Sequence, residues 1–239
     1  MSGHSKWHSI KHKKAATDAK RGQSFTKLAN IISAAARTGG GDPNANLRLK
    51  IAIESARKDN LPKENIERAI KRGTGELGGA IIEEFTIEAF ASGNIGLLIE
   101  VITDNRNRTL AEVRNIISKA GGRVADNGSV AHLFEQKGVI RAALDTLTAE
   151  QEEAVIDSGA LDYDLTDGTL TITATRNDLN VVKTAVEAVN INPETAQLEF
   201  VASVPLPIEA EIETKLLNLL ETLDNNDDVA NVSTNAEGI

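Results

Sequence analysis

The period of the apolar residues changes near Ile81, and this change limits the possible folds more than any other feature of the chain. Before it, in "QSFTKLANIISAAAR", apolar residues recur at every third or fourth position, as on one face of an α-helix. After it, "EEFTIEAFAS" and "NIGLLIEVITD" have the pattern of two strands joined through Gly93, which predicts a β-hairpin. The sequence therefore predicts a helical part followed by a part built on sheets.

The helical part contains three segments with helical spacing. The first ends in "TGGGDPNAN", where glycines and Pro43 break a helix. Spacing of the same kind resumes in "NLRLKIAIESARKDN" and, after Pro62, in "PKENIERAIKRG", which ends at Gly73. We therefore expect a three-helix unit over residues 23–73.

From residue 81 to the end, the expected elements follow the order ββα, βαββαβ, αβ. The first helix after residue 81 is expected to begin in "TLAE", a capping-box pattern at Thr109–Glu112. A strand follows in "GSVAHLFEQKGVIRAAL". The middle run matches the ferredoxin-like motif, and the flanking pieces can pair with each other as a second such unit, interrupted by the first. The predicted class is α+β, with an N-terminal three-helix domain and then two ferredoxin-like α/β domains, the first of them discontinuous. The predicted boundaries are a flexible basic arm at 1–22, a helical domain at 23–78, a discontinuous domain at 79–128 plus 206–239, and an inserted domain at 129–205.

Charge is distributed very unevenly along the 239 residues, whose formal net charge is −9. Residues 1–75 hold 16 Lys and Arg against 6 Asp and Glu, whereas the remainder holds 10 against 29. A charge asymmetry of this size indicates which kind of partner the chain binds and says little about its fold. It predicts that the first third of the chain contacts a polyanion.

The opening residues are the most cationic stretch. Trp7 offers a ring that can stack on a base, which contributes about 1–3 kcal/mol on single strands, and basic side chains release counterions from phosphates. The alternative is a solubilising tail whose tryptophan packs on the helical unit. Because the whole first third is cationic, we favour nucleic-acid binding by the following residues: Lys6, Trp7, Lys11, Lys13, Lys14, Lys20 and Arg21.

The third helix carries a second basic surface. Arg68, Lys71 and Arg72 fall on one face by the three-and-four rule, while two isoleucines fall opposite, toward a core. The alternative is an ordinary solvated face, since two glutamates are interleaved. We favour binding to nucleic acid here as well.

The segment "TDNRNRT" at 103–109 lies between a strand and a helix, and two interpretations of it remain open. Arg106 and Arg108 would lie beside free N–H groups at the helix N-terminus, a natural anion site. Alternatively, polar side chains of the segment cap the helix while the arginines pair with acids across the domain.

Neither catalysis nor metal binding is indicated. The histidines His4, His8 and His12 are four apart but have no acid or cysteine nearby to complete a metal site. The acidic clusters at 162–167 and 224–228 lack the EF-hand pattern, and no HExxH, P-loop or GxSxG motif occurs, so we interpret the clusters as solvated loops. We expect no enzyme activity, no metal, no cofactor and no obligatory small-molecule ligand.

The absence of cysteine fits a reducing compartment, and neither a signal-peptide pattern nor a run of about 20 apolar residues is found. We therefore expect a soluble, cytoplasmic protein without a membrane partner.

Five motifs in order from residue 3 to 134 resemble the YebC/PmpR family: "GHSKWHSIKHKK", "RGQSFTKL", "NLPKENIERAIKRGTG", "ITDNRNRT" and "GGRVADNGSVAHLF". The length and the C-terminal layout also agree. The chain differs from the family at "IEAFASGNIGLLIE", where a run with tyrosines, glycines and proline is usual.

The resemblance implies a helical domain and two α/β domains around a central cleft, without known catalysis. Members are described as DNA-binding transcriptional regulators; others are ribosome-associated translation factors, including the mitochondrial translational activator of cytochrome c oxidase, and bacterial relatives are linked to relief of stalling at proline-rich stretches. Some of the residues favoured above for nucleic-acid binding fall on positions that match the family motifs. They are Lys6, Trp7, Lys11, Lys14, Arg21, Arg68, Lys71 and Arg72.

The predicted function is that of a non-enzymatic, nucleic-acid-binding regulator of gene expression, in the first place a DNA-binding transcriptional regulator. The alternative is a translation factor that binds ribosomal RNA and acts on stalled or proline-rich synthesis. Electrostatics do not separate the two, because both partners are phosphate polymers.

Overall fold

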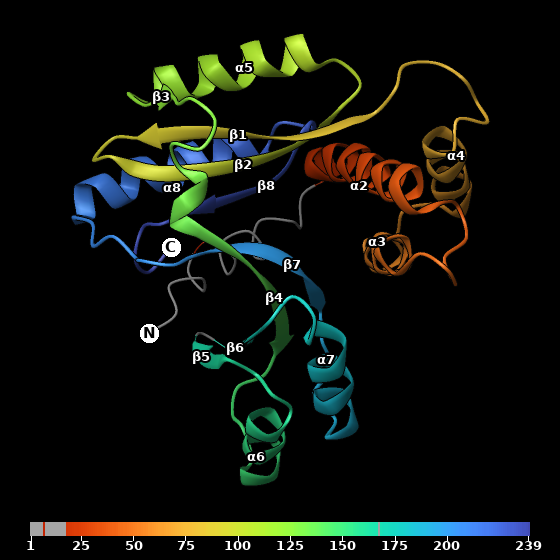
Figure 1. The fold of residues 1–239 in the computed structure, drawn as a ribbon, viewed down its shortest axis with the longest axis vertical. Helices are drawn as coiled ribbons and strands as arrows, with labels where there is room; N and C mark the ends of the chain where they lie inside the picture. The colour runs from red at the N-terminus through yellow and green to blue at the C-terminus, as the bar shows by residue number, and fades with distance from the viewer. Residues whose placement is uncertain (1–6, 8–17, 167) are drawn as a thin grey trace. The chain divides into compact units, whose positions relative to one another are not determined.

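A computed structural model describes residue 7, residues 18–166 and residues 168–239. The N-terminal part is helical: α2 (Asp18–Gly39), α3 (Leu47–Lys58) and α4 (Lys63–Gly73) pack together around an apolar core (Figure 1). The three predicted helices are confirmed. The first begins at Asp18 rather than at residue 23, because a helix held by an apolar stripe can extend into polar residues that carry no periodic signal.

Close packing places α4 on α2. A Cβ added at Gly73 would lie 2.2 Å from the carbonyl oxygen of Ser33, so only glycine permits this approach. The Ser33 hydroxyl also donates to the carbonyl of Ala69 at 2.8 Å. These contacts fix the last turn of α4, which carries Arg72.

The first sheet has the strand order β3-β1-β2-β8. Its strands are β1 (Glu83–Ala91), β2 (Ile95–Thr103), β3 (Arg123–Val124) and β8 (Val229–Thr234). β1 and β2 form the predicted hairpin, and the helices α5 (Arg106–Lys119) and α8 (Ala210–Asp224) contact each other. Since β8 comes from the end of the chain, the segments on either side of the central run share a sheet, as predicted.

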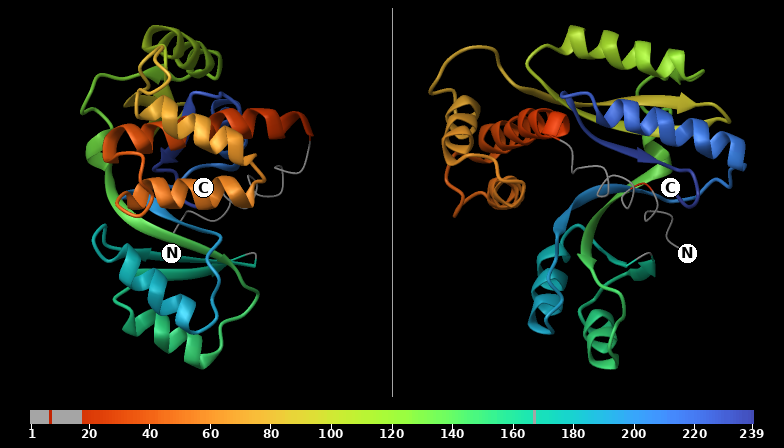
Figure 2. Two further views of the ribbon diagram at one scale, coloured as in Figure 1. Left: turned by 90° about the vertical axis from the view of Figure 1, so that its right-hand side faces the viewer. Right: turned by 180° about the vertical axis from the view of Figure 1, so that it is seen from behind.

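The second sheet is built from the central run and has the order β5-β6-β4-β7. Its elements are β4 (Phe134–Ala143), α6 (Ala149–Asp157), β5 (Asp162–Thr166), β6 (Thr169–Ala174), α7 (Leu179–Ala188) and β7 (Thr195–Ala202). The predicted βαββαβ order is confirmed, and α6 and α7 cover one face of the sheet (Figure 2). The class is α+β, with N-terminal helices followed by sheets.

The strand expected from Gly128 onward begins only at Phe134, after a short 3-10 turn, η1 (Ala131–Leu133). The buried carboxylate of Glu88 accepts the N–H groups of Gly128, Val130 and Ala131 at 2.6, 2.5 and 2.8 Å. These donors are therefore engaged in a loop and are not available to a sheet.

The second sheet also contains a buried ion pair. Two guanidinium nitrogens of Arg141 lie 2.5 and 2.8 Å from the carboxylate oxygens of Glu199, and Gln197 donates to the same carboxylate at 2.9 Å. Both charged residues are buried. The pair therefore joins the central strand β4 to the edge strand β7.

Two compact units can be distinguished by their internal contacts. One comprises residues 14–131 and 209–232, and the other comprises residues 132–208 with 233–239 and with Trp7. The four-part division with boundaries after residues 22, 78, 128 and 205 stays a prediction.

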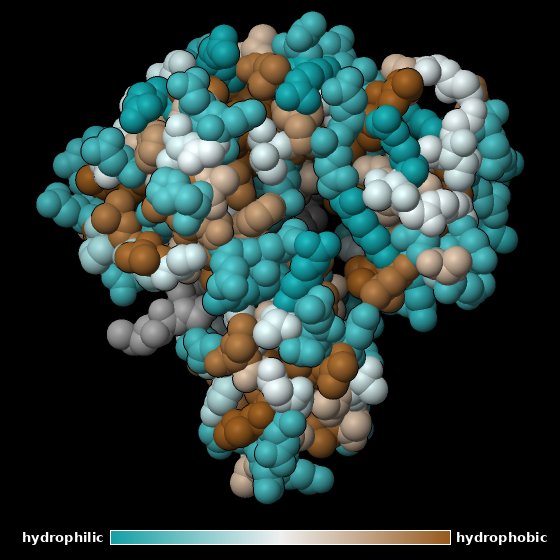
Figure 3. All heavy atoms as spheres, viewed as in Figure 1, coloured by the Kyte–Doolittle hydropathy of each residue, from teal (hydrophilic) through white to brown (hydrophobic). Residues whose placement is uncertain are grey.

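Apolar residues appear on the face drawn in Figure 3 in scattered groups among hydrophilic ones. The large apolar side chains that are exposed come from many different elements: Leu47, Leu77, Ile81, Ile156, Leu161, Val181 and Val204. Within the described ranges, every helix is too short or too polar to cross a lipid bilayer.

We expect Gly73→Ala to lower the free energy of unfolding by about 1–3 kcal/mol, because the added methyl group must displace a backbone carbonyl of α2. Chemical denaturation followed by circular dichroism measures the change. Lys71→Ala, on the exposed side of the same helix, should alter stability by less than about 0.5 kcal/mol and serves as the control. Equal stability of Gly73→Ala and the wild type would contradict the close approach of the two helices.

Candidate nucleic-acid interface

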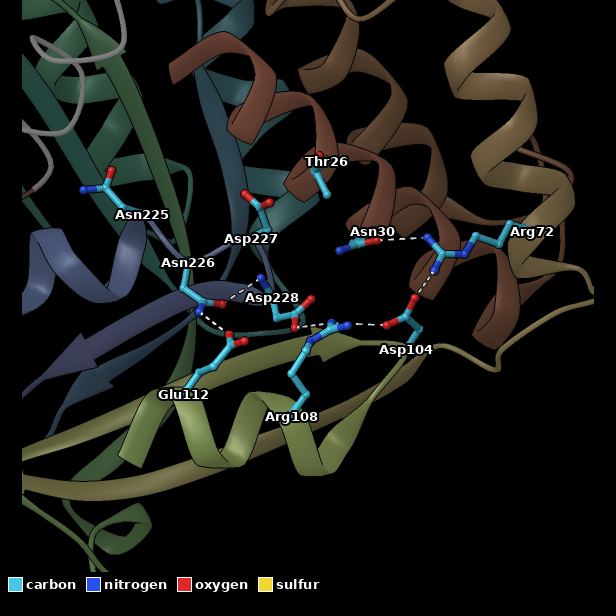
Figure 4. Close-up of a pocket in the computed structure, with 10 residues that line it drawn as sticks. All are labelled: Thr26, Asn30, Arg72, Asp104, Arg108, Glu112, Asn225, Asn226, Asp227 and Asp228. Carbon is cyan, nitrogen blue, oxygen red and sulfur yellow. Dashed lines mark hydrogen bonds and ion pairs between the residues drawn. The ribbon is translucent and has the colours of Figure 1, made fainter. Parts of the chain in front are cut away.

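A polar pocket of about 460 Å³ opens between α2, α4, the start of α5 and the turn from α8 to β8 (Figure 4). All of its lining residues belong to the unit of residues 14–131 and 209–232. They are Thr26, Asn30, Arg72, Asp104, Arg108, Glu112, Asn225, Asn226, Asp227 and Asp228. The pocket thus lies at the junction between the helical part and the first sheet.

Asp228 is the most buried carboxylate of the pocket. It accepts hydrogen bonds from the Thr109 hydroxyl at 2.6 Å, from Nη2 of Arg108 at 2.7 Å and from the Thr103 hydroxyl at 3.0 Å. Its own carbonyl accepts the N–H of Ile102 at 2.8 Å. One residue at the start of β8 therefore holds both the end of β2 and the first turn of α5.

A chain of alternating charge continues from Arg108 toward the helices. Asp104 accepts from Nη2 of Arg108 at 3.2 Å and from Nη2 of Arg72 at 3.0 Å, and Nη1 of Arg72 donates to Asn30 at 3.2 Å. The hydrogen bond to Asp228 raises the pKa of the Arg108 guanidinium above its ordinary value. Every hydrogen bond of this guanidinium to the described residues uses Nη2. The N–H groups of Nε and Nη1 are therefore available to a ligand.

The other side of the pocket is acidic. Asp227 is exposed as a residue, but partial desolvation of its carboxylate raises its pKa, the charge of Asp228 raises it further, and Lys27 opposes the shift. Lys27 itself lies 2.6 Å from Asp224. Four carboxylates and two guanidinium groups line the cavity, which favours a ligand with hydrogen-bond donors over a free phosphate.

The described cations of the first 75 residues differ in whether they pair with a carboxylate. Lys27, Arg48 and Arg72 pair with carboxylates from later segments, at Asp224, Glu84 and Asp104 respectively. Arg68 and Lys71 are exposed on α4 and pair with none of the carboxylates that the structure describes. The positive charge predicted from the sequence is thus reduced by ion pairs. It remains without a described carboxylate partner at Arg68 and Lys71 of α4 and at Lys50 and Arg57 of α3, all of them exposed.

The basic arm can be placed only in part. Lys6, Lys11, Lys13 and Lys14 lie outside the described residues, and Lys20 and Arg21 belong to the first turns of α2. Trp7 is 8% exposed and belongs to the unit of residues 132–208. Stacking on a base needs an open ring face, so the predicted role of Trp7 requires a state in which the indole is released.

The two arginines of "TDNRNRT" have different surroundings. Arg106 lies 3.6 Å from Glu83 and its guanidinium lies 3.9 Å from the centre of the Phe85 ring, whereas Arg108 lines the pocket. The pairing of both arginines with acids, one of the two interpretations drawn from the sequence, is present. The anion site at Arg106 and Arg108 stays a prediction.

Two interpretations of acidic and capping residues were wrong. The N-cap of α5 is Asn105, whose side chain accepts the N–H of Arg108 at 3.1 Å, and Thr109 is a buried partner of Asp228 instead of the cap. Asp228 does not lie in a solvated loop, because it is 7% exposed and holds three donors. The sequence signal for this was weak: Asp228 directly precedes the apolar strand that begins at Val229.

Comparison with known proteins agrees with this architecture. The family model of the TACO1/YebC protein N-terminal domain matches residues 5–76, and that of the TACO1/YebC second and third domain matches residues 82–236. The chain belongs to the TACO1/YebC family. Both matches together span the helical part, the pocket and both sheets.

Relatives of this TACO1/YebC chain are similar over nearly their whole length. A protein of Treponema denticola is 46% identical over 99% of this chain and 96% of its own length, and one of Persephonella marina is 48% identical with the same coverage. Each is named a probable transcriptional regulatory protein. The crystal structure of a conserved hypothetical protein from Aquifex aeolicus matches with a TM-score of 0.88 and 41% identity, over 95% of both chains.

We expect Asp228→Asn to lower the free energy of unfolding by about 2 kcal/mol, because a neutral amide oxygen replaces the charged oxygen, Oδ2, that accepts three hydrogen bonds, one of them from the Arg108 guanidinium. Denaturant titration measures the loss. Asp157→Asn, an exposed aspartate at the end of α6, is the matched control and should be nearly neutral. A loss no larger than the control's would show that Asp228 does not hold this junction.

Trp7 is the chain's single tryptophan, so its fluorescence reports on one site. Because the indole is enclosed, we expect blue-shifted emission and weak quenching by acrylamide in the free protein. Unfolding in denaturant should produce the red shift and the strong quenching of a solvated indole. Emission of the folded protein that already matches the denatured one would contradict the burial of Trp7.

Proposed function

We propose that this protein is a non-enzymatic regulator of gene expression that binds nucleic acid through the exposed face of α4 and the basic arm, with DNA as its first target. The observation that carries the proposal is the pair Arg68 and Lys71, which is exposed on α4 without carboxylate partners among the described residues. The names of the relatives, probable transcriptional regulatory proteins, support it.

The physical basis is the release of counterions. A cation that contacts a phosphate displaces condensed counterions, so affinity falls as salt rises. Arg68 and Lys71 are one turn apart and present two such cations on one helix face. The arm residues add further cations in sequence, and the proposal assigns them to the same polymer.

RNA is the second candidate, in a translation factor that acts on stalled or proline-rich synthesis. Sequence-specific reading of duplex DNA usually needs a helix with several base-reaching side chains. The exposed side of α4 instead interleaves its cations with Glu64 and Glu67. The pocket beside Arg72 favours RNA, because irregular RNA offers unpaired bases.

We expect the double substitution Arg68→Glu with Lys71→Glu to weaken binding to duplex DNA and to an RNA hairpin by at least 10-fold at low salt. The slope of log affinity against log salt should become shallower by about 2, one for each lost phosphate contact. Fluorescence anisotropy with the full-length protein over a series of salt concentrations measures both quantities.

The matched control is Arg114→Glu with Lys119→Glu, which reverses two exposed charges on α5 of the same unit. Equal effects of the two double variants would mean that only net charge matters and would remove α4 from the proposal. Preference for DNA over an RNA of equal charge supports the transcriptional role; the reverse preference supports the translational one.

A further inference from the structure

The pocket beside α4 has a mixed chemistry that a simple ion does not satisfy. Its carboxylates Asp104, Glu112, Asp227 and Asp228 repel an anion, while Arg72 and Arg108 repel a cation. A suitable ligand is neutral and offers both hydrogen-bond donors and acceptors. With about 460 Å³, the cavity is large enough for a planar heterocycle.

The polar groups of the pocket that have no described hydrogen-bond partner restrict which neutral ligands can bind there. The Asp227 carboxylate accepts no hydrogen bond from the described residues, and its neighbour Asp228 makes a second negative charge costly there. A ligand N–H group would relieve that cost. Nε and Nη1 of Arg108 are donors without a described partner and call for an acceptor on the same ligand.

A nucleobase edge provides this combination. Guanine presents two adjacent donors, N1–H and N2–H, which match one carboxylate, and two acceptors, O6 and N7, which match a guanidinium. In a duplex the Watson–Crick edge is already paired, so the base has to be unpaired.

The neighbouring cations fit the flanking phosphates. Arg72 lines the pocket. Lys71 directly precedes Arg72 in sequence, and Arg68 lies one helical turn before Arg72 on α4; both Arg68 and Lys71 are exposed. Phosphates held by Arg68 and Lys71 therefore lie along the helix that also supplies Arg72 to the pocket, and the pocket's carboxylates repel phosphates from its interior.

From this geometry we infer that the pocket takes the edge of an unpaired guanine, with Asp227 as acceptor and Arg108 as donor, while Arg68 and Lys71 hold the adjacent phosphates. The inference rests on the proposed function, since it specifies which nucleic acids the α4 face prefers. The partner class is a structured RNA or DNA with a bulged or single-stranded guanine.

The test uses the full-length protein and three RNA hairpins of equal length: one fully paired, one with a single bulged guanine and one with a single bulged uracil. We expect the bulged-guanine hairpin to bind about 10-fold more tightly than either of the others in competition anisotropy. Equal affinity for guanine and uracil bulges would overturn the inference, because it would show a preference for distortion alone.

Asp227→Asn is the decisive variant, because this side chain is exposed and accepts no hydrogen bond that folding needs. The amide keeps one acceptor oxygen and turns its NH₂ group toward the second donor of guanine, so the preference for guanine should fall at least 5-fold. Affinity for the paired hairpin should stay the same or rise slightly, since a negative charge is removed. Asp157→Asn is the charge-matched control and should leave the guanine preference intact.

The outcomes separate this inference from the proposed function. Salt-dependent binding without guanine preference leaves the proposed function standing and removes the pocket assignment; absence of binding to all three hairpins and to duplex DNA removes both. Free guanosine should compete with the bulged hairpin only at far higher concentration than the RNA itself. Competition at a similar concentration would overturn the assignment to a nucleotide within a chain.

Discussion

The carboxylate of Asp228 is the contact on which the geometry of the pocket depends. Three donors from β2 and α5 converge on it, and none of these elements is near it in sequence: the partners lie 119–125 residues away. A buried carboxylate is unfavourable unless several strong donors satisfy it. The turn from α8 to β8 is therefore fixed against the start of α5, and Arg108 is held with one nitrogen engaged and the others available.

The same network explains why the helical part and the first sheet form one unit. Asp104 shares its carboxylate between Arg108 of α5 and Arg72 of α4, and Arg72 in turn contacts Asn30 of α2. Exposed ion pairs contribute little stability one at a time. Here each partner is positioned by a buried neighbour, so the chain of charges acts as a positioning device more than as a source of stability.

The fold was largely predictable because its signals are local. The helical stripe that includes Ile32 and the alternation along β1 and β2 identify helices and strands from a few residues each. The order of elements also predicted that β8 returns to the first sheet. The site was less predictable. In the sequence, Asp228 is one acid among several in a polar segment. Only the tertiary structure brings it to Thr103, which lies more than a hundred residues earlier.

Ion pairing also reduces the positive charge that the sequence makes available to a partner. The first third of the chain has a net charge of +10, yet Lys27, Arg48 and Arg72 face carboxylates of later segments. The charges of these cations are partly neutralised by their partners, so they attract a distant phosphate less strongly. Arg68 and Lys71 of α4, like Lys50 and Arg57 of α3, are exposed and lack a described carboxylate partner. Arg68 and Lys71 lie on the same helix as Arg72, which lines the pocket, so the proposed phosphate contacts and the proposed base site are neighbours along α4.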